Sequence, residues 1–129
     1  MLIEQAILTK LLTTPGLIPL VGQKIYYVHA PQNVIQPYIV FSKISAPREH
    51  SHSGSSHLAI TRFQFSIFAS TYLKVKQIAG QIQDSLQAFS GIVDEVNINA
   101  IFYQNEIDFW DNDVKLYHTD CEYLIAHNE

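Results

Sequence analysis

The first apolar stripe of the chain lies in residues 2–13, where hydrophobic side chains recur every three or four positions. Ile3, Ile7 and Leu11 would share one side of a helix, with polar residues on the other side. Thr14-Pro15-Gly16 follows, and it ends the helix because proline cannot continue the hydrogen-bond ladder. The pattern predicts an N-terminal amphipathic helix, followed by an apolar connection over residues 17–22.

A second helical stripe begins after Thr71, a residue type that caps helix N-termini. Hydrophobic positions then recur at helical offsets from Val75 to Phe89. Gly91 stands just past the stripe, where a glycine commonly ends a helix. We therefore predict a second helix over this stretch, with Gly91 as its C-terminal stop.

Other stretches alternate between apolar and polar residues, which is the pattern of half-buried strands. The clearest is 58–69, where one face carries Ala59, Thr61, Phe63, Phe65 and Ile67. Further strands are predicted at 25–28, 38–44, 96–109 and 115–126. The order α-β-β-β-α-β-β predicts one α+β domain over residues 1–129, with a mostly antiparallel sheet and both helices packed on one face.

Composition narrows the class of protein. The 129 residues fit a single domain, and 16% charged residues is low against the usual value of about 25%. Few charges together with seven Tyr and seven Phe suggest a surface partly covered by another protein chain. One cysteine excludes an intrachain disulfide. We expect a soluble protein made in a reducing cytoplasm, because neither a signal peptide nor an apolar run of membrane length is recognisable.

Charge is distributed unevenly along the chain. Residues 1–64 carry five basic and two acidic side chains, whereas residues 65–129 carry three basic and ten acidic ones. The net charge of −4 argues against a dedicated nucleic-acid-binding protein, which would show a basic patch. Such asymmetry can instead mark surfaces that bind partners.

Histidines gather in the polar segment 47–57, where His50, His52 and His57 lie near Arg48 and Glu49. Zinc would need three or four ligands in a tetrahedral arrangement, and the Ser/Gly-rich sequence here does nothing to preorganise them. We favour an exposed loop that becomes ordered on contact with a partner, and we predict no metal site.

Searches for catalytic groups give no candidate. Cys121 and His118 would point to opposite faces of an alternating strand, so Cys121 is predicted to be a buried core residue. The acids Glu106, Asp108, Asp111 and Asp113 crowd around a turn, where carboxylates are normally solvated and help form the turn. Phosphate-binding glycine loops and nucleophile motifs are absent from the sequence. We therefore predict neither catalytic residues nor a cofactor.

Trp110 lies beside Phe109 in the acidic segment. One interpretation is an aromatic side chain that packs on the hairpin or in the core. The other is an interface anchor, because tryptophan is enriched at binding hot spots. The sequence favours the first and leaves the second open.

The order of these features resembles the tail-completion or tail-terminator proteins of long-tailed bacteriophages and prophages. The matching segments follow the N-terminal helix and extend almost to the end of the chain. They are Thr14-Pro15-Gly16-Leu17, Leu20-Val21-Gly22-Gln23-Lys24-Ile25-Tyr26, Ala30-Pro31-Gln32, Pro37-Tyr38-Ile39-Val40-Phe41, Ile44-Ser45, Thr71-Tyr72 and Tyr117-His118-Thr119-Asp120. The histidine content of the 47–57 loop departs from the family pattern.

The resemblance implies a structural virion protein, without enzymatic activity, located at the head–tail interface. Such proteins form rings, typically hexamers, that cap the major tail tube protein and dock to the head connector, while genomic DNA passes through without specific binding. If the early basic residues (Lys24, Lys43, Arg48 and Arg62) and the late acids lie on opposite flanks of one subunit, a head-to-tail ring would pair them. Alternatives are a head-completion or neck adaptor protein, or a small cytosolic ligand-binding or enzymatic α+β domain.

Overall fold

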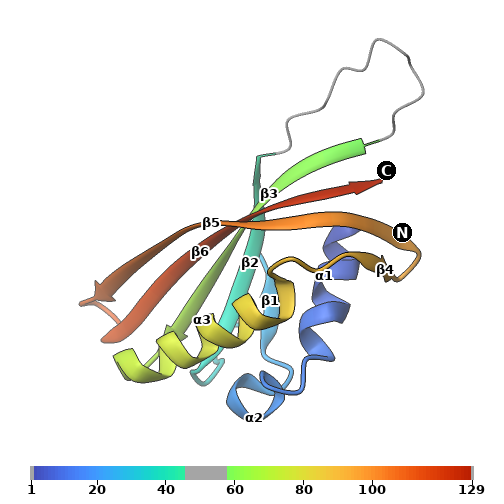
Figure 1. Cartoon of the computed structure of the whole chain (residues 1–129). Helices are drawn as coiled ribbons and strands as arrows, with labels where there is room; N and C mark the ends of the chain where they lie inside the picture. The colour runs from blue at the N-terminus through green and yellow to red at the C-terminus, as the bar shows by residue number, and fades with distance from the viewer. Residues whose placement is uncertain (1, 46–57, 129) are drawn as a thin grey trace.

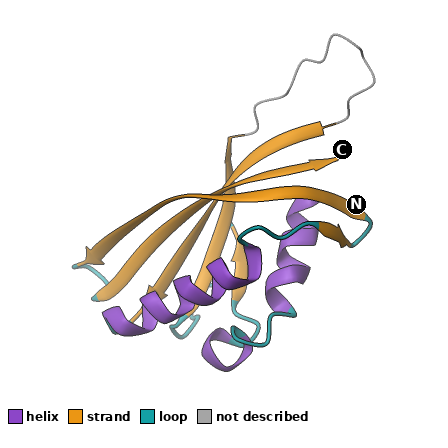
Figure 2. Cartoon of the chain, in the orientation of Figure 1, coloured by secondary structure: helices purple, strands orange, loops and turns teal. Residues whose placement is uncertain are grey.

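The computed structural model describes residues 2–45 and 58–128, which build a curled six-stranded sheet with helices packed against it (Figures 1 and 2). The helices are α1 (Ile3–Leu12), α2 (Ile18–Val21) and α3 (Tyr72–Leu86). The strands are β1 (Ile25–Tyr27), β2 (Tyr38–Ser45), β3 (Leu58–Ala69), β4 (Gly91–Val93), β5 (Val96–Asp111) and β6 (Leu116–Asn128). The predicted α+β class is confirmed.

The strand order across the sheet is β1-β2-β3-β6-β5-β4. β1 runs parallel to β2, whereas every other neighbouring pair is antiparallel, so the sheet is mixed. The long strands β3, β6 and β5 lie next to one another, and β1 and β4 form the two short edges. This order places the early and late parts of the chain at opposite sides of the sheet.

Period-two alternation produces the core. On β3, Phe63 and Phe65 are fully buried, and residues between the buried positions are half-buried on the other face. Phe65 stacks on Phe41 with ring centroids 5.5 Å apart and meets Tyr123 edge-on at 5.6 Å. The prediction that Cys121 is a buried core residue is confirmed, and Tyr123 on the same face of β6 is also fully buried. Aromatic side chains from three neighbouring strands therefore form the centre of the core.

Both predicted helices are present, and their stripes face this core. The buried side chains of α1 are Ile3, Ala6, Ile7 and Leu11, and those of α3 are Val75, Ile78, Ala79, Ile82 and Leu86. Thr71 caps α3 by accepting a hydrogen bond from the backbone N–H of Lys74 at 3.2 Å. The hydroxyls of Thr14 and Ser85 lie 2.7 Å apart and connect the ends of α1 and α3.

Three local features differ from the sequence prediction. The connection after Gly16 contains the short helix α2, in which Pro19 occupies the first turn, a position that needs no backbone N–H. Gly91 does not end α3; the helix ends at Leu86, and Ala88 takes the left-handed turn with φ of 60°. Gly91 instead begins β4, a strand of three residues that has too few positions to show a periodic pattern.

Candidate functional site

The second half of β5 turns charged side chains toward α3. Glu106 pairs with Cys121 and Asp108 pairs with Thr119 across the β5–β6 ladder, and both partners point to the core side. The pairing shifts between Tyr103 and Asn105, which is the mark of a β-bulge. The inward face of β5 is therefore apolar near β4 and acidic near the β5–β6 turn.

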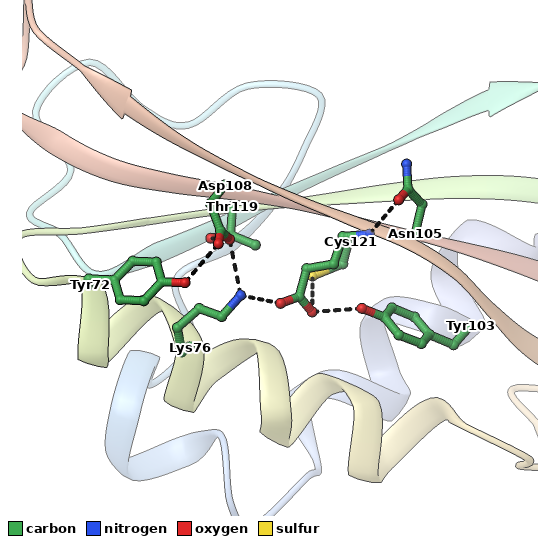
Figure 3. Close-up of polar contacts among 8 residues, drawn as sticks. Tyr72, Lys76, Tyr103, Asn105, Asp108, Thr119 and Cys121 are labelled. Atoms are coloured by element: carbon green, nitrogen blue, oxygen red, sulfur yellow. Dashed lines mark hydrogen bonds and ion pairs between the residues drawn. The ribbon is translucent and has the colours of Figure 1, made fainter.

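Lys76 of α3 lies between these two carboxylates (Figure 3). Its Nζ forms ion pairs with Glu106 and, at 3.0 Å, with Oδ1 of Asp108. Tyr72, one helical turn earlier, donates its hydroxyl to Oδ2 of Asp108 at 2.8 Å. Thr119 donates to Oδ1 of Asp108 at 2.9 Å. Two residues of α3 thus reach the same acidic stretch of β5.

Glu106 also receives donors from the sheet. The hydroxyl of Tyr103 lies 2.9 Å from Oε1 of Glu106, and the thiol of Cys121 lies 3.8 Å from the same oxygen. Burial, together with the hydrogen bond to Glu106, raises the pKa of Tyr103 to about 12. The tyrosine therefore stays protonated at neutral pH and acts as a donor.

The electrostatics of this cluster favour the charged forms of the ion pairs. Partial burial disfavours the ammonium of Lys76, but hydrogen bonds from its amine to Glu106 and Asp108 outweigh burial and raise the pKa of Lys76 above its usual value. Burial likewise opposes ionisation of Asp108, and the donors Tyr72, Lys76 and Thr119 outweigh it, so the pKa of Asp108 is lowered. Lysine and aspartate are both charged at neutral pH, which makes the cluster a tie between α3 and the sheet.

This arrangement corrects one prediction. Glu106 and Asp108 were expected to be solvated acids near a turn. Glu106 is half-buried, Asp108 is exposed as expected, and both lie within β5 and pair with Lys76 of α3. Asp111 does form the turn, because its Oδ1 accepts the backbone N–H of Asp113 at 3.0 Å. The sequence signal that could have revealed the cluster is Tyr72 and Lys76 at i, i+4 spacing, which places both on one side of a helix.

The face of the sheet opposite the core carries an aromatic row that crosses four strands. Tyr38 of β2 stacks on Phe68 of β3 at 4.9 Å between ring centroids, and Phe68 stacks on His118 of β6 at 4.4 Å. Phe109 of β5 completes the row at 5.2 Å from His118. Residues in cross-strand register build this row, and its side chains remain partly exposed.

Beside that row the same face becomes polar. Asp120 accepts a hydrogen bond from Ser66 at 2.7 Å and pairs with His118. Burial raises the pKa of Asp120, but the bonds from His118 and Ser66 outweigh burial, so the pKa of this carboxyl is lowered. Arg62 lies 3.4 Å from Glu122 one row further along. The face thus presents a band of rings next to a band of paired charges.

Trp110 stands near the end of β5 with 51% of its surface exposed. Its ring meets Tyr117 edge-on across the hairpin, with centroids 4.9 Å apart, and its Nε1 lies 3.4 Å from the side-chain oxygen of Asn112. The indole packs on one side and faces solvent on the other. This geometry leaves half of a large apolar side chain available to a partner.

The predicted partner-binding loop lies outside the described residues. Its named members are Arg48, Glu49, His50, His52 and His57. Within residues 2–45 and 58–128, histidine, cysteine and acidic side chains do not gather in threes as a metal site would require. None of the helices in those ranges has the length and apolar content needed to cross a membrane.

Charged side chains on the two flanks of the sheet differ in sign. Lys24 immediately precedes β1, and Lys43 lies on β2, at one side of the strand order. The acids of β5 and of the turn after it lie toward the other side. The uneven distribution along the chain is therefore partly a distribution in space. Glu4 pairs with Lys43 at 3.1 Å on the first flank, and Arg62 lies on the central strand β3, 3.4 Å from Glu122 of β6.

Comparison with known proteins agrees with the fold. A chain from a solved structure described as the virion of a native gene transfer agent particle superposes with a TM-score of 0.85 at 14% sequence identity, covering 98% of this chain and 95% of that chain. No match is found among curated proteins. The family model described as tail completion protein gp17 matches residues 5–128, nearly the full length. The chain therefore belongs to the tail completion protein gp17 family of phage virion proteins.

Proposed function

We propose that this protein caps the finished tail tube and joins it to the head connector, and that it does so as a closed ring. Its family gives it a structural place in the virion tail. The capping and joining role extends that place to two partners, the major tail tube protein on one side and the connector on the other. The match to the family over residues 5–128 is the observation that carries the proposal.

The distribution of surface residues supports assembly. A closed ring needs heterologous contacts, in which one patch of each subunit meets a different patch of the next. Lys24 and the Lys43–Glu4 pair at one flank and the acids of β5 at the other supply two different patches. Three of the exposed aromatic side chains, Phe102, Phe109 and Trp110, lie on β5 at the acidic flank. Apolar area of this kind stabilises a contact once a partner covers it.

The role is one of binding, without chemistry on a substrate. The most connected polar group, around Lys76, pairs its charges internally and joins a helix to the sheet. The net charge of −4 also suits a ring through which DNA passes, because a basic lining would hold the phosphate backbone. Genomic DNA is therefore expected to pass through without specific binding.

Purified protein offers the direct test. Native mass spectrometry and negative-stain images would be recorded for the chain alone and mixed with tube protein, and we expect rings in at least one of the two. Adding the protein to unfinished tails should then restore their attachment to heads. The proposal would be overturned if the protein stays monomeric, does not bind the tube protein and does not complete tails. Binding to the connector without binding to the tube would assign it to the neck as an adaptor.

A further inference from the structure

β5 has a long open edge. β4 pairs only with Val96–Ile98 of β5, and the backbone N–H of Ala88 bonds to the carbonyl of Ile101 at 3.3 Å. From residue 103 to 111, no strand in the described parts of the chain pairs with that side of β5. Strands with an unpaired edge of this length are templates for another strand.

Alternate backbone groups of residues 103–111 point outward from the open edge of β5, away from β6. The N–H of Glu106 bonds to the side-chain oxygen of Asn105 at 2.9 Å, so it faces the open edge and not β6. Alternation along an antiparallel ladder gives Asp108 and Trp110 the same orientation. Main-chain groups at these positions could therefore bond to an added strand, which is the usual mode of β-augmentation.

The opposite side of the sheet offers a matching edge. β1 ends at Tyr27, whereas β2 continues to Ser45, so in the described chain β2 extends past its neighbour. A groove of about 520 Å³ lies at this step, with Tyr27, Val28 and Lys43 among its lining residues. Val28 is 69% exposed. This edge is apolar in its centre, and its margins carry Lys24 and the Lys43–Glu4 ion pair.

Charge determines which edges can meet. Residues 103–115 hold four carboxylates (Glu106, Asp108, Asp111 and Asp113), and only Lys76 and Lys115 offset them. Two β5 edges facing each other would place these acids side by side, which is destabilising in cross-strand positions. The β1–β2 edge carries Lys24 and Lys43. Glu4 of α1 pairs with Lys43 at 3.1 Å, so Lys24 gives this edge its positive charge. The acidic edge therefore complements the other edge of a second copy better than it complements itself.

We propose that the open edge of β5, residues 103–111, adds to the sheet at the β1–β2 edge of a second copy of this chain. The contact is heterologous, extends one sheet into the next, and covers Trp110. It rests on the proposed function, since it names the subunit contact of the ring. Repeated around an axis, it closes a ring with no free edge.

Engineered cysteines test the geometry. Ile107 is 42% exposed on β5, and Ser42 lies half-buried on β2, and both belong to the face opposite the core. The double variant Ser42→Cys/Ile107→Cys would be treated with a short bismaleimide and separated on a denaturing gel. We expect a ladder of covalent oligomers that ends at the ring size. The native Cys121 is fully buried and does not contribute.

The single variants are the matched controls. Ser42→Cys alone and Ile107→Cys alone should remain monomeric on the gel, because each contact needs both positions. Dimers from Ile107→Cys alone would show that β5 edges meet each other and would overturn the proposal. Circular dichroism and thermal unfolding would confirm that all three variants keep the wild-type fold.

Charge exchange provides a second, independent test. Lys24→Glu and Asp113→Lys should each weaken ring formation, by at least about tenfold in the association constant, and their combination should restore it. If the wild type forms rings and none of these substitutions alters the association constant, this contact is overturned and the proposed function stays intact. If the wild-type protein forms no ring, either alone or with tube protein, both this contact and the proposed function are overturned.

Discussion

Lys76 on α3 and Asp108 on β5 are 32 residues apart in the sequence, and their Nζ and Oδ1 atoms lie 3.0 Å apart. Their ion pair, extended to Glu106, fastens the first turns of α3 to residues 103–111 of β5, a stretch with no neighbouring strand on its outer side in the described chain. The tie positions β5 without covering its open edge. Its contribution to stability can be measured separately from assembly.

Replacing Lys76 by Met should destabilise the fold. The change leaves the half-buried Glu106 and the exposed Asp108 without their cation, so we expect a loss of about 1–2 kcal/mol, between the values for exposed and buried pairs. Urea unfolding at neutral pH measures the loss. Lys74→Met on the same helix is the control, because the structure shows no ion pair for Lys74 among its described residues. Equal effects of the two variants would contradict a specific role for Lys76.

Acid should weaken the fold through Asp120. The pKa of this carboxyl is lowered in the folded state by His118 and Ser66, so its ionised form stabilises the protein above the unfolded pKa of about 3.9. The stabilisation is lost as the pH falls through that region toward the folded value. Asp120→Asn should therefore cost about 1.5 kcal/mol at pH 7 and progressively less toward pH 3. Urea midpoints at several pH values would show the two curves converging.

The matched control for that series is Asp113→Asn, which alters an exposed carboxylate on the β5–β6 turn. Its stability curve should run parallel to that of the wild type at every pH. A difference between Asp120→Asn and wild type that stayed constant from pH 7 to pH 3 would show that ionisation of Asp120 is not the cause of the loss.

The sequence predicts an element correctly where a single physical rule determines its structure. β3 alternates strictly because one of its faces packs on the core, and Thr71 caps α3 because its hydroxyl can reach a free backbone N–H. In β5 that rule breaks down. Two shifts in register, after Ile98 and after Tyr103, interrupt the alternation, so the inward direction of Glu106 cannot be read from its position in the sequence.

The candidate contact surfaces depend on strand order, which sequence patterns do not specify. The excess of acids in residues 65–129 was visible in the sequence, but the position of the β5 acids on the side of the sheet opposite Lys24 follows from β6 pairing between β3 and β5. The parallel β1–β2 pair was equally hidden, because a three-residue strand carries no signal of direction. The sequence does not show that Trp110 is half-exposed, because its exposure depends on how it packs against Tyr117 across the hairpin.

Cys121 should resist thiol reagents in the native protein. Burial, followed by the nearby charge of Glu106, raises the pKa of its thiol to about 12, and the side chain is fully buried. The reactive thiolate is therefore scarce as well as shielded. We expect Ellman's reagent at pH 8 to react at least about 100-fold more slowly in buffer than in 8 M urea. Rapid reaction in buffer would show that β6 opens readily.

Tyr123→Phe tests whether a buried hydroxyl weakens the core. Tyr123 is fully buried between Phe65 and Tyr103, and within the described chain its Oη has no hydrogen-bond partner. Leaving such a group unpaired costs about 1–3 kcal/mol, so removing it should hold stability constant or raise it. The measurement is the urea midpoint, with Tyr103→Phe as control, because that variant loses a hydrogen bond to Glu106 and should be less stable. A loss of more than about 1 kcal/mol in Tyr123→Phe would mean that the hydroxyl has a bonding partner in solution, and the centre of the core would then be polar at that point.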